Sequence, residues 1–199
     1  MTKGRVPRAF TEEELRLLAA SGDELAEWTK EMSFDIDRLV ARLKGERWQQ
    51  ILQAHLYFDH VLSALLKEEL RHPDAIDVKR MSFAQKLQLV HAIGLVRSDI
   101  VPTIAAVNRV RNRLAHDLEA EIGDGEVQQL TNTVPSWFKK QVMKPEEWKG
   151  PDVLRDTLVY LLAFLDGERQ RQALRRLQQR KAYLNAARVL DQIDVPYAP

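Results

Sequence analysis

Residues 104–119 read IAAVNRVRNRLAHDLE, and the apolar side chains of this stretch decide the fold. They recur at intervals of three, four or seven residues: Ile104, Val107, Leu114 and Leu118. Such spacing is typical of an amphipathic helix that buries one face in a core. We therefore predict a helix here, with the other helices of the chain arranged around it.

The polar side chains of the same stretch carry the chemistry. Asn108, Asn112 and His116 follow one another at intervals of four, so two amides and an imidazole share one helix face. Two further arginines flank them, Arg109 and Arg113. Arg111 lies about 140° around the helix from His116, at roughly 100° per residue. Only its long side chain, a local distortion or a second copy of the helix would bring the two together.

Composition limits the class of protein. The chain has 199 residues, of which 45% are hydrophobic and 30% charged, enough for one good core with an appendage. The 30 lysines and arginines nearly balance the 29 acidic residues, so no strong overall field for nucleic acid is expected. Any basic patch must therefore be local.

Several classes of site and location are excluded or disfavoured. Without cysteine the chain has neither disulfides nor a thiolate metal site, and the sequence predicts no cofactor. No phosphate-binding glycine motif, metalloprotease motif or β-strand alternation is present, which favours an all-α fold. No apolar run approaches the ~18 residues that span a bilayer, and the chain opens without an apolar signal segment. We expect a cytoplasmic protein with no membrane partner.

Before the central stretch, the pattern predicts a mobile arm and a pair of helices. Residues 1–10 have no periodicity. Thr11 and Glu14 form a capping box that opens a short helix to about residue 20. The second helix runs over 23–44, with an apolar stripe that includes Met32 and Ile36.

The next helix, residues 46–71, has a wider apolar surface than one stripe and is expected at the centre of the bundle. His55 and His60 lie within it, five residues apart. A metal-binding histidine pair on a helix is spaced by four. Packing or a satisfied hydrogen bond is therefore the favoured role for both.

Glycine and serine punctuate the following segments. Ser82 is expected to cap a helix over 83–93, which Gly94 closes. After the central stretch, Gly123 and Gly125 are expected to mark a turn.

Residues 136–151 are predicted to be the least regular part of the chain. They gather three aromatic side chains, Trp137, Phe138 and Trp148, with Pro145, Gly150 and Pro151. Aromatic side chains in a loop can stack on bases or bind a partner. Anchoring of an irregular segment onto the bundle is the favoured interpretation.

The C-terminal part begins with an apolar helix over 153–165, which Asp166-Gly167 is expected to interrupt. The segment beyond is strongly basic. Its candidate RNA-binding residues are Arg169, Arg175, Arg176 and Arg180. Such a helix can follow a phosphate backbone, make an oligomer contact or present a solvated face. The predicted organisation is an arm (1–10), a single bundle domain (11–166) and a basic C-terminal helix and tail (167–199).

The central stretch also resembles a known family. The run RNRLAH, residues 111–116, fits the R-x4-H motif of the HEPN superfamily of helical bundles. Three segments, HLYFDHVLSALLKEEL, FAQKLQLVHAIGLV and VNRVRNRLAH, resemble in their order the core helices of the mannitol-repressor-like and related branches. The resemblance covers about residues 46–120, with 152–166 as a last bundle helix. It implies an all-α, up-and-down bundle.

The resemblance implies a function as well. Active HEPN members are metal-independent endoribonucleases, often toxins with a cognate antitoxin protein, and they dimerise so that the motifs of two subunits line one cleft. By this resemblance His116 is the acid or base, Arg111 the phosphate ligand and Asn112 the residue that orients the phosphate or the imidazole. Two flanking residues are candidate RNA contacts, Arg109 and Arg113.

The expected protein is thus a cytoplasmic, homodimeric HEPN-type bundle that acts on RNA. One alternative is a non-catalytic HEPN regulator or scaffold of the mannitol-repressor-like kind, in which histidine, arginine and amide side chains tie a dimer together. A generic helical interaction protein is the third interpretation. Fold resemblance by itself does not decide between catalysis and scaffolding.

Overall fold

The computed structural model describes residues 9–117, 119–142 and 150–192. Within them every regular element is helical and no strand occurs, which confirms the predicted all-α class. None of the described helices combines the length and apolarity needed to cross a bilayer. Residues 1–8 of the predicted arm lie outside the described residues.

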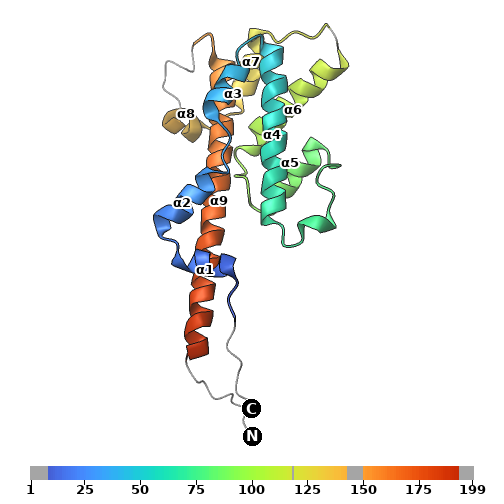
Figure 1. Ribbon diagram of the computed structural model, residues 1–199. Helices are drawn as coiled ribbons and strands as arrows, with labels where there is room; N and C mark the ends of the chain where they lie inside the picture. Colours follow the sequence, from blue (N-terminus) through green and yellow to red (C-terminus); the bar gives the residue numbers. More distant parts are fainter. Residues whose placement is uncertain (1–8, 118, 143–149, 193–199) are drawn as a thin grey trace. The chain divides into compact units, whose positions relative to one another are not determined.

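Figure 1 labels the helices in chain order. They are α1 (Glu12–Ala19), α2 (Gly22–Lys30), α3 (Ile36–Arg42), α4 (Arg47–Glu69), α5 (Phe83–Ala92), α6 (Val101–His116), α7 (Asp124–Asn132), α8 (Ser136–Val142) and α9 (Val153–Gln192), with a short 3-10 turn, η1 (Pro73–Ala75). The chain divides into two compact units. The bundle unit comprises Phe34–Arg169, and the terminal unit combines the described residues before Phe34 with those after Arg169. The helix α9 contributes to both.

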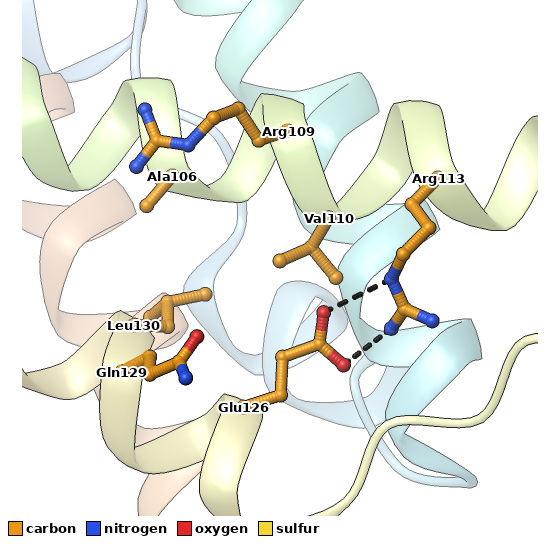
Figure 2. A pocket seen from close by; sticks show the side chains of 7 residues that line it. All are labelled: Ala106, Arg109, Val110, Arg113, Glu126, Gln129 and Leu130. Carbon is orange, nitrogen blue, oxygen red and sulfur yellow. Dashed lines mark hydrogen bonds and ion pairs between the residues drawn. The ribbon is translucent and has the colours of Figure 1, made fainter.

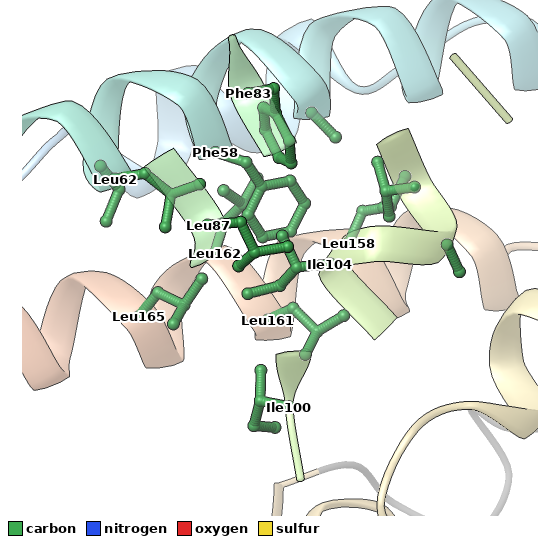
Figure 3. Packing of buried hydrophobic residues seen from close by; sticks show 14 of the residues in the cluster. Phe58, Leu62, Phe83, Leu87, Ile100, Ile104, Leu158, Leu161, Leu162 and Leu165 are labelled. Atoms are coloured by element: carbon green, nitrogen blue, oxygen red, sulfur yellow. The ribbon is translucent and has the colours of Figure 1, made fainter. Parts of the chain in front are cut away.

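The bundle unit is built around α4, as the wide apolar surface of this helix predicted. The helix packs against α5 and α6, and its Phe58 and Leu62 are fully buried. Figure 3 shows these two side chains among residues of α5, α6 and α9. The α9 side chains in this core are Leu154, Leu158, Leu161, Leu162 and Leu165. An apolar surface on several sides of α4 is needed because more than one helix covers it.

The terminal unit has a small core of its own. Leu17 of α1, Leu25 of α2 and Leu184 of α9 are buried together. The ammonium group of Lys181 donates to the carbonyl oxygen of Ala20, which satisfies a carbonyl at the end of α1. The predicted N-terminal helix pair therefore groups with the C-terminal part of α9.

Most predicted helix ends are confirmed. Thr11 and Glu14 form the expected capping box at α1. At α5, the N–H of Gln85 donates to Ser82 Oγ (3.3 Å) and the N–H of Ser82 donates to Gln85 Oε1 (2.8 Å). Gly94 follows α5 with φ of +77°, a left-handed conformation that favours glycine and stops the helix.

The single helix predicted over 23–44 is wrong, because α2 ends at Lys30 and α3 begins at Ile36. The carboxylate of Asp35 accepts the N–H of Arg38 at 3.1 Å and so caps a new helix. Met32 and Ile36, which the apolar stripe placed inward, are both exposed. The break also coincides with the boundary between the two units.

The turn predicted at Gly123 and Gly125 is also wrong. Gly123 is the N-cap of α7, and Gly125 lies in its first turn. A glycine inside a helix costs about 1 kcal/mol relative to alanine. Burial of Val127 and Leu130 outweighs this cost, since each buried side chain contributes roughly 1.5 to 3 kcal/mol.

Residues 136–142 of the segment predicted to be irregular form α8, and the aromatic pair on it is anchored. Trp137 Nε1–H donates to Asp99 Oδ2 at 2.6 Å, and the guanidinium of Arg97 lies 4.5 Å from the centre of the Trp137 ring. Phe138 is fully buried. The anchoring role is confirmed for this pair, while Trp148 and Pro145 lie outside the described residues.

The predicted interruption at Asp166-Gly167 is absent, because α9 continues through it. Arg169, one turn further on, donates from Nε to Glu68 Oε1 of α4 at 2.9 Å. Its guanidinium also lies 3.7 Å from Asp166. Contacts of the residues on both sides of Gly167 therefore hold the helix together where local propensity disfavours it.

We predict that Phe58→Ala lowers the free energy of unfolding of the bundle unit by about 3 to 5 kcal/mol, because a large buried side chain leaves a cavity. Leu56→Ala on the same helix is the control, since Leu56 is 62% exposed. Urea unfolding followed by circular dichroism measures both variants. Equal destabilisation by the two substitutions would contradict the packing described here.

Candidate functional site

One face of α6 is fixed by burial, and this determines what the opposite face presents. Ile104 and Val107 are fully buried in the bundle core. The hydroxyl of Thr103 donates to the backbone carbonyl of Thr133 at 2.8 Å. Rotation of α6 about its axis would expose this apolar face, so the polar residues that follow are held in fixed directions.

Asn108 is joined to a histidine from α4. The Nε2–H of His55 donates to Asn108 Oδ1 at 3.0 Å. The His55 ring is buried and stacks on Phe83, with ring centres 4.3 Å apart. The favoured sequence interpretation, a packed or hydrogen-bonded side chain, is confirmed for His55. It is wrong for His60, which is exposed and has no hydrogen-bond partner among the described residues.

Arg111 and Asn112 lie on the same side of α6 as Asn108. The Nη1–H of Arg111 donates to Asn112 Oδ1 at 3.2 Å. All three residues, together with His55, line a groove of about 480 Å³. Its other lining residues are Leu56, Asp59, Lys79, Met81, Ser82, Phe83, Ala84 and Lys86. We call it the α4–α5–α6 groove.

An ion pair between a buried lysine and a half-buried aspartate forms part of the wall of this groove. Lys86 Nζ donates to both carboxylate oxygens of Asp59 at 2.7 Å. The Lys86 side chain is only 5% exposed. A buried ammonium group requires such a partner, so this cation is engaged by the fold.

His116 lies apart from the groove. It is the last residue of α6, is exposed and is not among the groove's lining residues. Among the described residues it has no hydrogen-bond partner. A single chain therefore brings Arg111 and Asn112 together but does not add His116 to them. For Arg111 this agrees with the angle expected on a straight helix.

The flanking arginines lie in a second, smaller hollow of about 240 Å³ between α6 and α7. Figure 2 shows Arg113 directed toward Glu126 of α7, whereas the Arg109 side chain extends along α6 toward Ala106. Arg113 Nε donates to Glu126 Oε1 at 3.2 Å, and Nη2 donates to the carbonyl oxygen of Glu121 at 3.1 Å. The charge of Arg113 is thus compensated within the chain, whereas Arg109 is exposed.

The basic residues of α9 occupy different environments. Arg169 is buried in its ion pair with Glu68, unlike the exposed phosphate contact expected for it. In the terminal unit Arg175 is exposed and Arg176 half-buried, and Arg180 lies 3.6 Å from Glu13. An RNA contact by these three remains a prediction.

The sequence did not indicate that His55 lies beside Asn108. The two residues are 53 positions apart, and no spacing rule links them. The sequence indicates only that each residue belongs to a helix expected in the bundle core. Among the described residues, no group of three or more His, Asp or Glu side chains is arranged to hold a metal ion.

The groove lowers the pKa of His55 below its ordinary value of 6.5. Burial is the main cause, because it penalises the charged imidazole. The positive charges of Arg111 and Lys86 lower the pKa further, while the hydrogen bond with Asn108 and the charge of Asp59 oppose the shift. His55 is therefore mainly neutral at neutral pH.

Comparisons with known proteins add no relative. No protein-family model, no curated protein and no solved structure matches this chain. The function is therefore argued from the residues and their arrangement.

The lowered pKa of His55 predicts how stability depends on pH. As the pH falls below 6.5, the unfolded chain binds a proton at His55 before the folded protein does. The free energy of unfolding must therefore fall between this pH and the lower folded-state pKa. Urea unfolding between about pH 7.5 and pH 5 measures this dependence.

The matched variants are His55→Gln and His60→Gln, both on α4. Removing His55 should flatten the pH dependence, whereas removing the exposed His60 should leave it unchanged. An identical pH dependence in wild type and His55→Gln would show that His55 is not the group responsible.

Proposed function

We propose that this chain is an RNA-directed HEPN protein that cleaves RNA without a metal ion. The observation that carries the proposal is that the polar side chains of the R-x4-H motif are not buried in the core. Asn112 and His116 are exposed, and Arg111 is half-buried at the α4–α5–α6 groove. These side chains are therefore accessible to an RNA strand or to a second subunit.

The residue types suit metal-independent cleavage. A base must take the proton of the 2′-hydroxyl group, an acid must protonate the leaving oxygen, and a cation must stabilise the phosphorane. His116 serves as the acid or base, the role that histidine takes most often in proton transfer. Arg111 serves as the phosphate ligand, and Asn112 orients the phosphate or the imidazole.

Arg111 and His116 do not line the same groove within one chain, and this favours a two-fold homodimer. Within one chain His116 lies outside the groove that Arg111 lines. A second α6 facing the first would bring the His116 of one subunit toward the Arg111 of the other. Two-fold dimers are the commonest soluble oligomers, and an exposed motif leaves this surface available to a partner.

The second candidate function is that of a non-catalytic HEPN regulator or scaffold, working through protein contacts. It is favoured by the environment of His116, which lacks an orienting hydrogen bond among the described residues. Catalytic imidazoles are usually held by a second group. A cognate antitoxin protein is the expected partner in the toxin interpretation, and other proteins are expected in the regulator interpretation.

We predict that His116→Ala lowers the rate of RNA cleavage by a factor of at least ~10². Arg111→Ala should have nearly the same effect, because it removes the cation that stabilises the phosphorane. Cleavage of a single-stranded oligoribonucleotide, resolved by electrophoresis, is the measurement. His60→Ala is the matched control, since it removes an exposed histidine from α4.

Cleavage should also persist in EDTA. The regulator interpretation replaces this proposal if the wild-type protein cleaves no RNA and His116→Ala instead unfolds it or dissociates a dimer. Circular dichroism and light scattering of each variant separate loss of catalysis from loss of structure.

The dimer prediction can be tested by cross-linking, because the chain contains no cysteine. Ala115→Cys places a single thiol on the exposed part of the motif. A short bismaleimide should join two chains through it. The control is Lys67→Cys, which should cross-link poorly. Lys67 is exposed near the C-terminal end of α4. A monomer at micromolar concentration, or equal cross-linking at both positions, would exclude the facing arrangement.

A further inference from the structure

Both amides in the α4–α5–α6 groove have their oxygen atoms engaged by neighbours. Asn108 Oδ1 accepts from His55 at 3.0 Å, and Asn112 Oδ1 accepts from Arg111 at 3.2 Å. An asparagine amide has one oxygen acceptor and one NH2 group with two donors. Each oxygen already accepts one hydrogen bond, whereas the NH2 groups remain as donors for a ligand in the groove. Within the part of the chain that is described, Nδ2 of Asn108 has no protein partner.

Arg111 adds a charge that the fold does not compensate. Among the described residues it contacts no carboxylate. Other arginines of the bundle unit do: Arg47 pairs with Asp124, Arg97 with Asp99 and Arg155 with Asp156. A half-buried guanidinium that lacks such a partner attracts an anion, and its fork of donors fits two oxygens of a phosphate.

The remaining charges make the groove electropositive. Lys86 and Asp59 neutralise each other in their ion pair, so they add little net charge. Lys79, also a lining residue, is exposed and adds a second available cation at the rim. The groove thus offers two cations and two amide donors, while the one carboxylate among its lining residues is already paired.

The volume of the groove suggests more than a bare anion. About 480 Å³ lies within the usual range for small-molecule sites, roughly 300 to 1,000 Å³. The side chains of Leu56 and Met81 contribute apolar surface to the same groove, and Leu56 is 62% exposed. A nucleotide combines the required parts, since its phosphate accepts hydrogen bonds while its sugar and base have apolar faces.

We propose that the α4–α5–α6 groove binds the phosphate group of a nucleotide through Asn108, Asn112 and Arg111. Asn108 lies outside the R-x4-H motif and is the new ligand residue. His55 is a positioning residue, because its hydrogen bond to Oδ1 fixes the orientation of the Asn108 amide, and Asn108 lines the groove. That the nucleotide belongs to an RNA strand rests on the proposed function, whereas the phosphate site itself does not.

The test uses the full-length protein and an RNA that cannot be cleaved. A fluorescent, fully 2′-O-methylated single-stranded oligonucleotide is titrated with protein, and binding is followed by anisotropy. Asn108→Asp keeps the oxygen that accepts from His55 but replaces the donors by a negative charge. We expect the dissociation constant to rise about 10- to 100-fold, the range for loss of hydrogen bonds to a charged group.

The matched control is Gln88→Glu on α5, an exposed residue outside the groove. It makes the same amide-to-carboxylate change and the same change in net charge, so the affinity should stay near that of the wild type. Equal affinities of wild type and Asn108→Asp, with helicity preserved, would overturn the proposal.

A second measurement covers the case in which Asn108→Asp fails to fold. The side-chain NH2 signals of Asn108 in the ¹⁵N-labelled wild-type protein should shift on addition of inorganic phosphate. Signals that do not move at saturating phosphate would overturn the site. The role of His55 is tested with His55→Phe, which should weaken binding in the wild-type background but add no further loss to Asn108→Asp.

Competition distinguishes the source of the phosphate. Displacement of the labelled strand by unlabelled oligonucleotide at much lower concentration than by AMP supports an RNA strand. Equal displacement by AMP assigns the site to a free mononucleotide. Tight binding of the strand without cleavage of ordinary RNA would refute the ribonuclease proposal and leave the phosphate site intact, so the two failures are distinguishable.

Discussion

Burial of one face of α6 against the bundle core is the constraint on which the rest of the site depends. Ile104 and Val107 are completely inaccessible, and fully burying each contributes roughly 1.5 to 3 kcal/mol. This fixes the rotation of the helix. Every later residue then takes its direction from the helical period of about 100° per residue. The grouping of Arg111 with the two asparagines follows from this geometry. His116 shares the helix face of the asparagines but is the last residue of α6 and lies outside the groove.

Hydrogen bonds between polar side chains at the edge of the core stabilise the fold and also orient the amide groups of the groove. His55 cannot be buried cheaply unless a partner accepts its N–H, and Asn108 supplies the acceptor. This hydrogen bond fixes the orientation of the amide and leaves its NH2 donors without a partner among the described residues. Likewise, the contact that orients Asn112 uses its oxygen and one N–H of Arg111. Hydrogen bonds that stabilise the fold thus determine which kind of ligand the groove can accept.

Much of this arrangement is visible in the sequence, and the rest has identifiable reasons for being hidden. The end signals at Ser82 and Gly94 and the apolar stripe of α6 are local, so they predict the existence of these helices correctly. The helix α6 ends at His116, before the predicted end at Glu119, and Leu118 lies outside the described residues. The break before Asp35 was missed because the apolar spacing continues across it. The Asp35 carboxylate caps a new helix at this point, and the apolar spacing does not show this. At Gly167 the sequence predicted an interruption that is absent. Buried leucines of α9 and the Arg169–Glu68 ion pair stabilise a continuous helix there. The contact between His55 and Asn108 joins distant positions and has no sequence signature.

The position of His116 outside the groove separates two properties that a ribonuclease needs. Affinity for a phosphate depends on groups that one chain holds together, namely Arg111 and the two amides. Proton transfer depends on an imidazole at the end of α6, which needs a group from elsewhere to orient it. Under the proposed function, the bundle would bind a nucleotide as a single subunit and still require a second α6 for chemistry. Without the second α6, the chain would bind RNA but not cleave it. The catalytic and the regulatory interpretations therefore differ in whether a second α6 orients His116.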